Sequence, residues 1–122
     1  MNVEKIAAVC HELNREYCEA IGDFSQPTWK NAPDWQKNSA INGVAAIIEN
    51  PDRPPSASHD GWLKQKEAEG WIWGLEKKPE KKEHPCMVPY NNLSTEQRIK
   101  DELFTNTVKA LIPLFLSTPG VG

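Results

Sequence analysis

The chain has 122 residues, of which 39% are hydrophobic and 25% charged, so it can form one packed domain and is too apolar for global disorder. Its 14 Lys and Arg against 17 Asp and Glu give a formal charge of −3, which argues against a strongly basic binder of nucleic-acid polymers. The sequence has no membrane-length apolar run and no signal-peptide pattern, and its three cysteines (Cys10, Cys18, Cys86) do not suggest a disulfide framework. We therefore expect a cytoplasmic protein with no membrane contact.

Apolar residues at steps of three and four predict two helices in the first half of the chain. The first helix runs from Val3 to about Ile21 and stops at Gly22. An ordered loop with two large aromatics follows, and the second helix runs from Pro33 to Asn50. The expected inner faces are Ile6, Val9, Cys10, Leu13, Tyr17 and Ile21 in the first helix, and Trp35, Ile41, Val44, Ala45 and Ile48 in the second.

A third helix and a hairpin are predicted next. Ser56 or Ser58 caps the helix, which reaches Glu69 and stops at the following glycine. Residues 71–74 and 87–90 are expected to pair as the two strands of the hairpin, separated by a solvated loop rich in Lys and Glu.

A capping box at 94–97 starts the fourth predicted helix, and Pro113 is expected to bend or end it. Its inner face comprises Ile99, Leu103, Val108, Leu111, Ile112 and Phe115. The pattern as a whole predicts a mainly α fold: a compact four-helix domain with a short two-stranded β-hairpin.

The third helix carries the most informative side chains. His59, Trp62 and Lys66 are spaced by three and four residues and therefore share one face. A planar base could stack on Trp62 while a phosphate meets the Lys66 ammonium. In the alternative interpretation Trp62 belongs to the core and Lys66 lies along its surface.

The predicted hairpin adds further candidates, each with a structural alternative. Trp71 is expected to pack in the core, whereas Trp73 could line a pocket because Gly74 allows close approach. Lys81 and Lys82 belong to the charged loop, which is either a solvated loop or a source of cations for an anionic group.

No catalytic or metal-binding motif is present. The sequence has no phosphate-binding Gly-rich loop, no GxSxG and no HExxH, and His84 and Cys86 lack the second ligand pair of a zinc site. We expect no enzyme activity, no cofactor and no metal. The remaining enzymatic hypothesis is a hydrolase that acts through His59 or His84.

Three stretches of the sequence resemble the RyR domain, the module repeated in ryanodine receptors. They are HDGW at 59–62, EGWIWG at 69–74 and KKEHPCMVPYNNL at 81–93. The resemblance covers roughly residues 35–112, and the first helix with its Trp-containing loop looks like the small stand-alone form of bacteria and bacteriophages. It implies three parts: an N-terminal helix and loop at 1–34 packed on the domain, a RyR-like domain at 35–116, and a frayed tail at 117–122.

The resemblance also implies a function and a site. Family modules look like non-enzymatic nucleotide-binding sites, so the implied ligand is a small anionic nucleotide derivative of the ADP-ribose or cyclic ADP-ribose class. Trp62 would stack on the base, and phosphates would meet Lys66, His84, and Lys81 or Lys82, beside His59. Because receptor repeats face each other in pairs, a single copy would need a homodimer or a second ring. The candidates for that ring are Trp29, Trp35, Trp73, Tyr90 and Tyr17.

Two biological roles are compatible with that ligand class: a sensor in anti-phage signalling, or a phage-encoded sponge in the host cytoplasm. The alternative from a different class is a protein-interaction module that uses a Trp-rich face.

Overall fold

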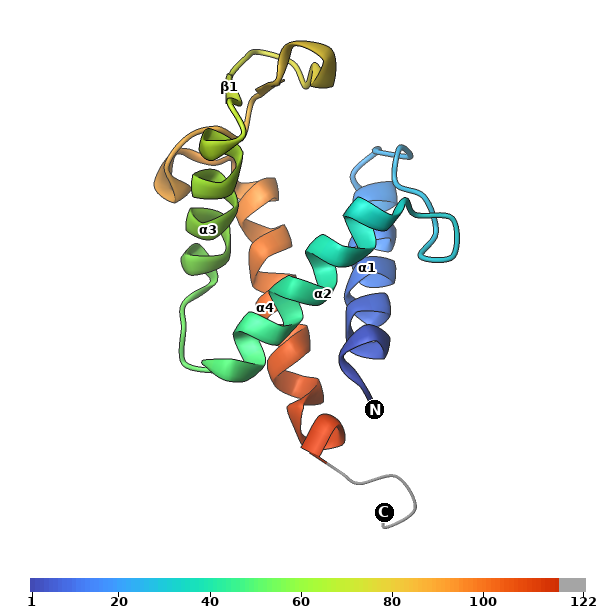
Figure 1. The fold of residues 1–122 in the computed structure, drawn as a ribbon. Helices are drawn as coiled ribbons and strands as arrows, with labels where there is room; N and C mark the ends of the chain where they lie inside the picture. The colour runs from blue at the N-terminus through green and yellow to red at the C-terminus, as the bar shows by residue number, and fades with distance from the viewer. Residues whose placement is uncertain (117–122) are drawn as a thin grey trace. The chain divides into compact units, whose positions relative to one another are not determined.

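The structure, a computed structural model, describes residues 1–116 and is mainly helical (Figure 1). The predicted fraying of 117–122 lies outside the described residues. The described part of the chain contains four α-helices and two short strands, which confirms the predicted fold class. None of the described helices is long and apolar enough to cross a membrane. The elements are α1 Val3–Ala20, α2 Asp34–Glu49, α3 Pro55–Ala68, β1 Ile72–Trp73, the 3-10 helix η1 Pro79–Lys81, β2 Glu83–His84, the 3-10 helix η2 Tyr90–Asn92, and α4 Thr95–Leu116.

The chain folds as two units, which are described separately. Unit 1 comprises Met1–Arg53 and the chain from Glu102 onward, and it contains α1, α2 and most of α4. Unit 2 comprises Pro54–Asp101 and contains α3, both strands, both 3-10 helices and the first turns of α4. The boundary within α4 falls between Asp101 and Glu102.

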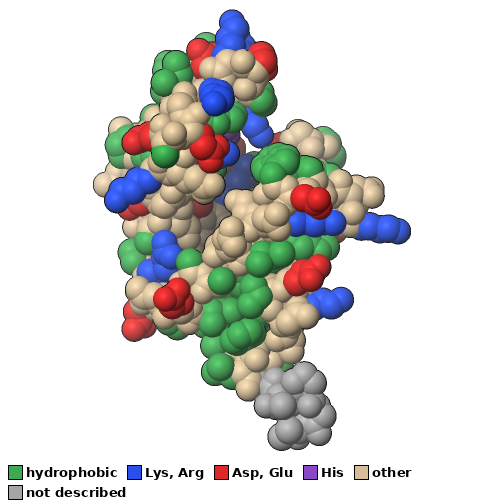
Figure 2. Space-filling model, viewed as in Figure 1, with side chains coloured by type: hydrophobic (Ala, Val, Ile, Leu, Met, Phe, Trp, Pro, Cys, Tyr) green, Lys and Arg blue, Asp and Glu red, His purple; other side chains and the backbone are tan. Residues whose placement is uncertain are grey.

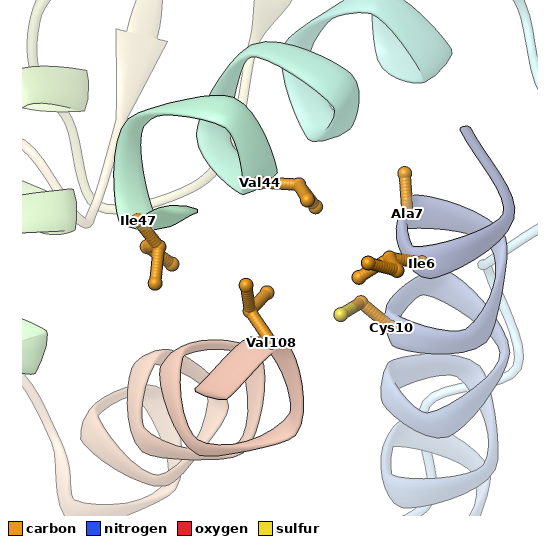
Figure 3. Packing of buried hydrophobic residues seen from close by; sticks show 6 residues of the cluster. All are labelled: Ile6, Ala7, Cys10, Val44, Ile47 and Val108. Carbon is orange, nitrogen blue, oxygen red and sulfur yellow. The ribbon is translucent and has the colours of Figure 1, made fainter. Parts of the chain in front are cut away.

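Unit 1 has a core built from three helices that are distant in sequence. Its fully or nearly fully buried side chains point toward one another from α1, α2 and α4 (Figure 3). They are Ile6, Ala7, Cys10, Val44, Ile47 and Val108. Half-buried apolar residues surround them, including Phe104 and Leu111 of α4, and in Figure 2 hydrophobic side chains gather over α2 and the adjoining part of α4.

The predicted inner faces of α1 and α2 are partly wrong. Ile6 and Cys10 are buried as expected, but Val9 is 36% and Leu13 43% exposed, and Trp35 at the start of α2 is 64% exposed. Ile21 and Ala45 are exposed as well. The buried face of α1 instead includes Ala7, His11 and Cys18 beside Ile6 and Cys10. Apolar periodicity alone does not distinguish that face from its neighbour.

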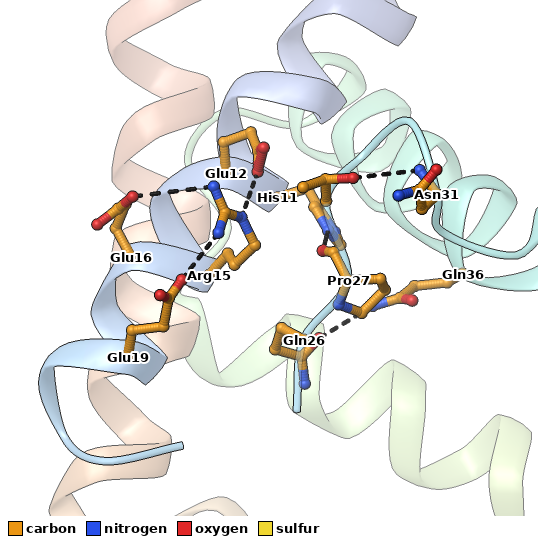
Figure 4. Close-up of polar contacts among 10 residues, drawn as sticks. His11, Glu12, Arg15, Glu16, Glu19, Gln26, Pro27, Asn31 and Gln36 are labelled. Atoms are coloured by element: carbon orange, nitrogen blue, oxygen red, sulfur yellow. Dashed lines mark hydrogen bonds and ion pairs between the residues drawn. The ribbon is translucent and has the colours of Figure 1, made fainter. Parts of the chain in front are cut away.

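Polar contacts hold the loop between α1 and α2 in place, as its predicted order requires (Figure 4). His11 Nε2 lies 2.7 Å from the carbonyl oxygen of Pro27, and the side-chain amide of Gln36 donates to the Gln26 side chain at 3.1 Å. The His11 ring also meets Trp29 edge-on, with 5.6 Å between ring centroids. The loop is thus fixed to both helices that it connects.

Helix ends follow local sequence rules with two exceptions. Gly70 has a φ of 89°, and the N–H groups of Gly70 and Trp71 donate to Glu67 and Lys66, so α3 ends in a Schellman motif as the glycine predicts. The start of α3 differs from the prediction: the helix begins at Pro55, whose missing N–H suits the first turn, and neither serine caps it. In addition, α4 does not end at Pro113 but continues to its last described turn.

The prediction of an antiparallel hairpin is wrong. The two strands pair in parallel, with Ile72 opposite Glu83 and Trp73 opposite His84. The chain reverses within a tight turn around η1, where Lys78 and Glu83 exchange two backbone hydrogen bonds of 2.9 and 3.1 Å. Lys82 adopts a left-handed φ of 55° and directs β2 back beside β1. Residues 87–90, expected as the second strand, instead lead into η2.

Ile47→Ala is expected to lower the free energy of unfolding by about 2–5 kcal/mol, because the side chain is fully buried and its removal leaves a cavity between α2 and α4. Ile72→Ala is the matched control, since Ile72 is 58% exposed; we expect a change within about 0.5 kcal/mol. Urea unfolding of both variants measures the difference. Equal destabilisation would contradict the assignment of the core.

Candidate ligand-binding site

Unit 2 contains a cluster of five interacting rings, here called the aromatic cluster: His59, Trp62, Trp71, His84 and Tyr90. His59 stacks on Trp62 with centroids 5.5 Å apart and planes inclined by 26°. His84 meets Trp62 edge-on at 5.1 Å and lies 6.3 Å from Trp71. Tyr90 lies 6.2 Å from His59. The cluster therefore connects four parts of unit 2: α3, the residue that follows its stop glycine, β2 and η2.

His59 is the buried anchor of the cluster. It is 5% exposed, and its Nε2 lies 2.7 Å from the carbonyl oxygen of Val88. Since a carbonyl can only accept, the proton lies on Nε2, and the Nδ1 atom is left as the other polar atom of the ring. This hydrogen bond fixes the orientation of the ring that stacks on Trp62.

The surroundings of His84 alter its chemistry within the cluster. The pKa of His84 falls to about 4, mainly because burial disfavours the charged ring and also because Lys77, Lys66 and Lys100 repel it. The Cys86 N–H donates to His84 Nδ1 at 3.0 Å, so the neutral ring carries its proton on Nε2. At neutral pH His84 is thus a half-buried hydrogen-bond donor within a field of lysines.

Asp101 and His84 should give opposite pH dependence to stability. Burial raises the pKa of Asp101 to about 6, so this group favours folding at low pH and loses that contribution as pH rises from about 4 to 6. The lowered pKa of His84 acts in the other direction, because its contribution is lost as pH falls from about 6.5 to 4. In Asp101→Asn, of these two groups only His84 still titrates, so we expect its urea midpoint to rise with pH in this range. In His84→Gln only Asp101 of the two still titrates, so we expect its urea midpoint to fall. Urea unfolding at pH 4, 5 and 6 checks both; identical slopes in the two variants would contradict the assignment.

The lysines predicted to meet phosphates have different roles. Lys66 lies over the Trp71 ring, 5.1 Å from its centroid, and 3.6 Å from the Glu69 carboxylate. Lys82 donates from Nζ to the Glu69 carbonyl at 2.8 Å and so caps the C-terminus of α3. Lys81 lies exposed at the end of η1. Lys66 therefore has contacts with Trp71 and Glu69, and Lys82 already has a structural partner.

The predicted aromatic residues are divided between the two units. Trp73 is in unit 2, 54% exposed on β1. Trp29, Trp35 and Tyr17 belong to unit 1, where Trp29 packs against the core and has Lys37 Nζ 5.8 Å from its ring centroid. The rings that accompany Trp62 within its own unit are those of the aromatic cluster.

Two residues of unit 2 are not predicted by the sequence as they lie in the structure. Trp71, expected in the core, is half-buried and contacts both His84 and Lys66. Its position directly after the stop glycine of α3 is the local feature that returns its ring toward that helix. The burial that raises the pKa of Asp101 has no signal in the sequence near it. The described residues include no group of three or more His, Cys, Asp or Glu side chains that could hold a metal, and all three cysteines are free.

Comparison with known families completes the description of the site. The family model of the RyR domain matches residues 52–117, more than half of the chain. The chain belongs to the RyR domain family. The RyR domain match begins after α2, later than the resemblance at residue 35, and it includes every member of the aromatic cluster. The candidate rings of unit 1, at positions 17, 29 and 35, lie outside the matched residues.

Proposed function

We propose that this RyR domain is a non-enzymatic binding module for a small anionic ligand derived from a nucleotide. The observation that carries the proposal is the neutral, Nε2-protonated ring of His84, which lies against Trp62 within a field of three lysines. An indole provides a surface for a base, and a neutral N–H donor among cations suits a phosphate oxygen. Together they combine the two chemistries that a nucleotide requires.

The roles follow from the contacts within unit 2. Trp62 stacks on the base, with Trp71, Trp73 or Tyr90 as the second wall. His84 Nε2 donates to a phosphate oxygen, and the positive potential comes from Lys77, Lys66 and Lys100, which lower the pKa of His84 in addition to the larger effect of burial. Lys81 is exposed and available to a longer ligand, whereas Lys82 supports the fold.

In its finer form the proposal concerns a small stand-alone RyR domain of a bacterium or phage that works in the cytoplasm. Its ligand belongs to the ADP-ribose or cyclic ADP-ribose class, and the module is either a sensor of that signal or a sponge that removes it. A second copy of the chain, if it dimerises, would add a further ring to the site.

A thermal-shift screen tests the proposal directly. Its probes are ATP, ADP-ribose, cyclic ADP-ribose and cyclic di-adenylate. A ligand at a hundred times its dissociation constant adds about 2.7 kcal/mol of apparent stability, which is several degrees for a domain of this size. We expect at least one adenine-containing probe to produce such a shift at millimolar concentration. No shift with any probe would overturn the proposal.

One observation favours the protein-interaction alternative. Ile72 and Trp73 of β1 are 58% and 54% exposed, and Leu75, two residues after the strand, is 81% exposed. The residues that follow, 76–83, carry both Lys and Glu side chains, and charges of both signs lie among apolar side chains at that end of unit 2 (Figure 2). If the nucleotide screen is flat, this apolar segment is the surface to test first, by substituting Trp73 with alanine in a binding assay against a candidate partner.

A further inference from the structure

The outer side of α1 carries apolar side chains that unit 1 leaves uncovered. Val9 and Leu13, one helical turn apart, are 36% and 43% exposed, and Ala20 continues the same side of the helix two turns later. The apolar side chains continue past the end of the helix, where Ile21 is 41% and Phe24 75% exposed. Scattered exposed apolar residues need no explanation, but a row at helical spacing is the pattern of a surface that receives another element.

An acidic ridge runs beside this apolar row. Glu12, Glu16 and Glu19 follow one another at steps of four and three on the adjoining side of α1. Arg15 lies among them, with its guanidinium nitrogens 2.9, 3.9 and 2.8 Å from the three carboxylates (Figure 4). One arginine cannot neutralise three carboxylates, so the ridge keeps a net negative charge. Glu16, whose side chain is 73% exposed, is the most open of the three.

The remaining charged groups of α1 do not change that sign. The helix has four glutamates, which include Glu4 in its first turn, against Lys5 and Arg15. Lys5 lies seven residues before Glu12, about two turns away. Asp23 follows the helix and holds Ser25 by hydrogen bonds to its backbone N–H and hydroxyl. The apolar row is thus flanked by a surface that attracts cations.

We propose that the outer face of α1, meaning Val9, Leu13, Glu12, Glu16 and Glu19, docks a basic amphipathic helix of another protein. Such a helix would place apolar side chains on Val9 and Leu13 and direct Lys or Arg toward the acidic ridge, so the two helices would pack side by side. Charge decides against two other occupants. A second copy would bring one acidic ridge against another, and an anionic membrane surface would be repelled.

This surface belongs to unit 1, whereas the site proposed for nucleotides belongs to unit 2. All five residues belong to unit 1 and precede residue 52, where the RyR domain match begins. The inference therefore does not rest on the proposed function, and either can fail alone.

The test uses the full chain and three labelled synthetic peptides of 18 residues, a length of about five helical turns. The first contains Leu at helical spacing with Lys elsewhere, the second is a scrambled sequence of the same composition, and the third has Glu in place of Lys. Fluorescence anisotropy measures the dissociation constants, and backbone amide chemical shifts locate the bound peptide. We expect the first peptide to bind at least about tenfold more tightly than the scrambled one and to shift α1 amides, because only it presents a continuous apolar face.

Variants distinguish docking from general attraction between opposite charges. Leu13→Ser should weaken binding of the first peptide by about fivefold or more, whereas Leu75→Ser, at a more exposed leucine of unit 2, should leave it unchanged. Glu16→Gln, a surface change that spares the core, should weaken binding and reduce its dependence on salt. Equal effects of the two leucine variants, equal binding of the scrambled peptide, or a dimer of the chain that Leu13→Ser dissociates would each overturn the proposal.

Discussion

Gly74→Ala is expected to lower the free energy of unfolding by about 1–3 kcal/mol and to displace His84 from Trp62. A Cβ at position 74 would lie 2.6 Å from the Glu83 Cβ, with Glu83 Cγ and Oε1 at 3.1 Å. Because Cβ is attached to the backbone, the clash cannot be relieved by rotating the end of a side chain. β1 and β2 must separate, and His84 follows Glu83 in β2. Urea unfolding measures the loss, and the His84 ring resonances report the displacement.

Gly61→Ala is the matched control for this variant, and its effect should have the opposite sign. Gly61 lies inside α3, and a Cβ there meets nothing within 4 Å. Alanine in a helix interior is favoured over glycine by about 0.5–1 kcal/mol, so this variant should be more stable than the parent chain. If both glycine variants were destabilised alike, the close approach of Gly74 to Glu83 would not be the cause.

Trp62→Ala should have the largest effect on ligand binding. The indole stacks on His59 and meets His84 edge-on, and in the proposed site it also stacks on the base. Base stacking on an aromatic side chain is worth about 1–3 kcal/mol, which corresponds to a dissociation constant about 5- to 150-fold higher for ADP-ribose. Isothermal titration calorimetry measures the change.

Two further variants make that result interpretable. Trp62→Phe keeps a ring at the same place, so it should retain more affinity than Trp62→Ala and show that folding is preserved. Trp35→Ala removes an exposed tryptophan of unit 1 and should leave affinity unchanged. An affinity that falls equally in Trp62→Ala and Trp35→Ala would exclude Trp62 as the stacking surface.

Local sequence rules account for most of the secondary structure. Helices were predictable where apolar spacing coincided with a cap, as at Gly70 or at Ser94, whose hydroxyl accepts from the Gln97 N–H at 3.3 Å. The parallel strand pair was not predictable, because it depends on Lys82 in the left-handed region where glycine is the usual residue. Lys82 also donates from Nζ to the Glu69 carbonyl, a contact between residues thirteen positions apart that no local pattern encodes.

The candidate site was predictable in part for the same reason. The shared face of His59 and Trp62 follows from their spacing on α3, and the structure stacks the two rings. The placement of His84 against Trp62 and Trp71 depends on the turn around η1, which no periodicity encodes. The prediction of the inner face of α1 is partly wrong, because α1 has two adjoining apolar rows. Which row is buried depends on the helices that pack against it.

Histidine side-chain NMR tests the central claim most directly, because the chain has three histidines and they lie in distinct surroundings. His59 and His84 belong to the aromatic cluster, whereas His11 is buried in unit 1 against Pro27 and Trp29. During a titration with ADP-ribose, we expect the ring resonances of His84 to shift most and those of His59 to shift with them. The ring resonances of His11 should not shift. Saturable binding with all three histidines unmoved, or with His11 moving alone, would contradict it.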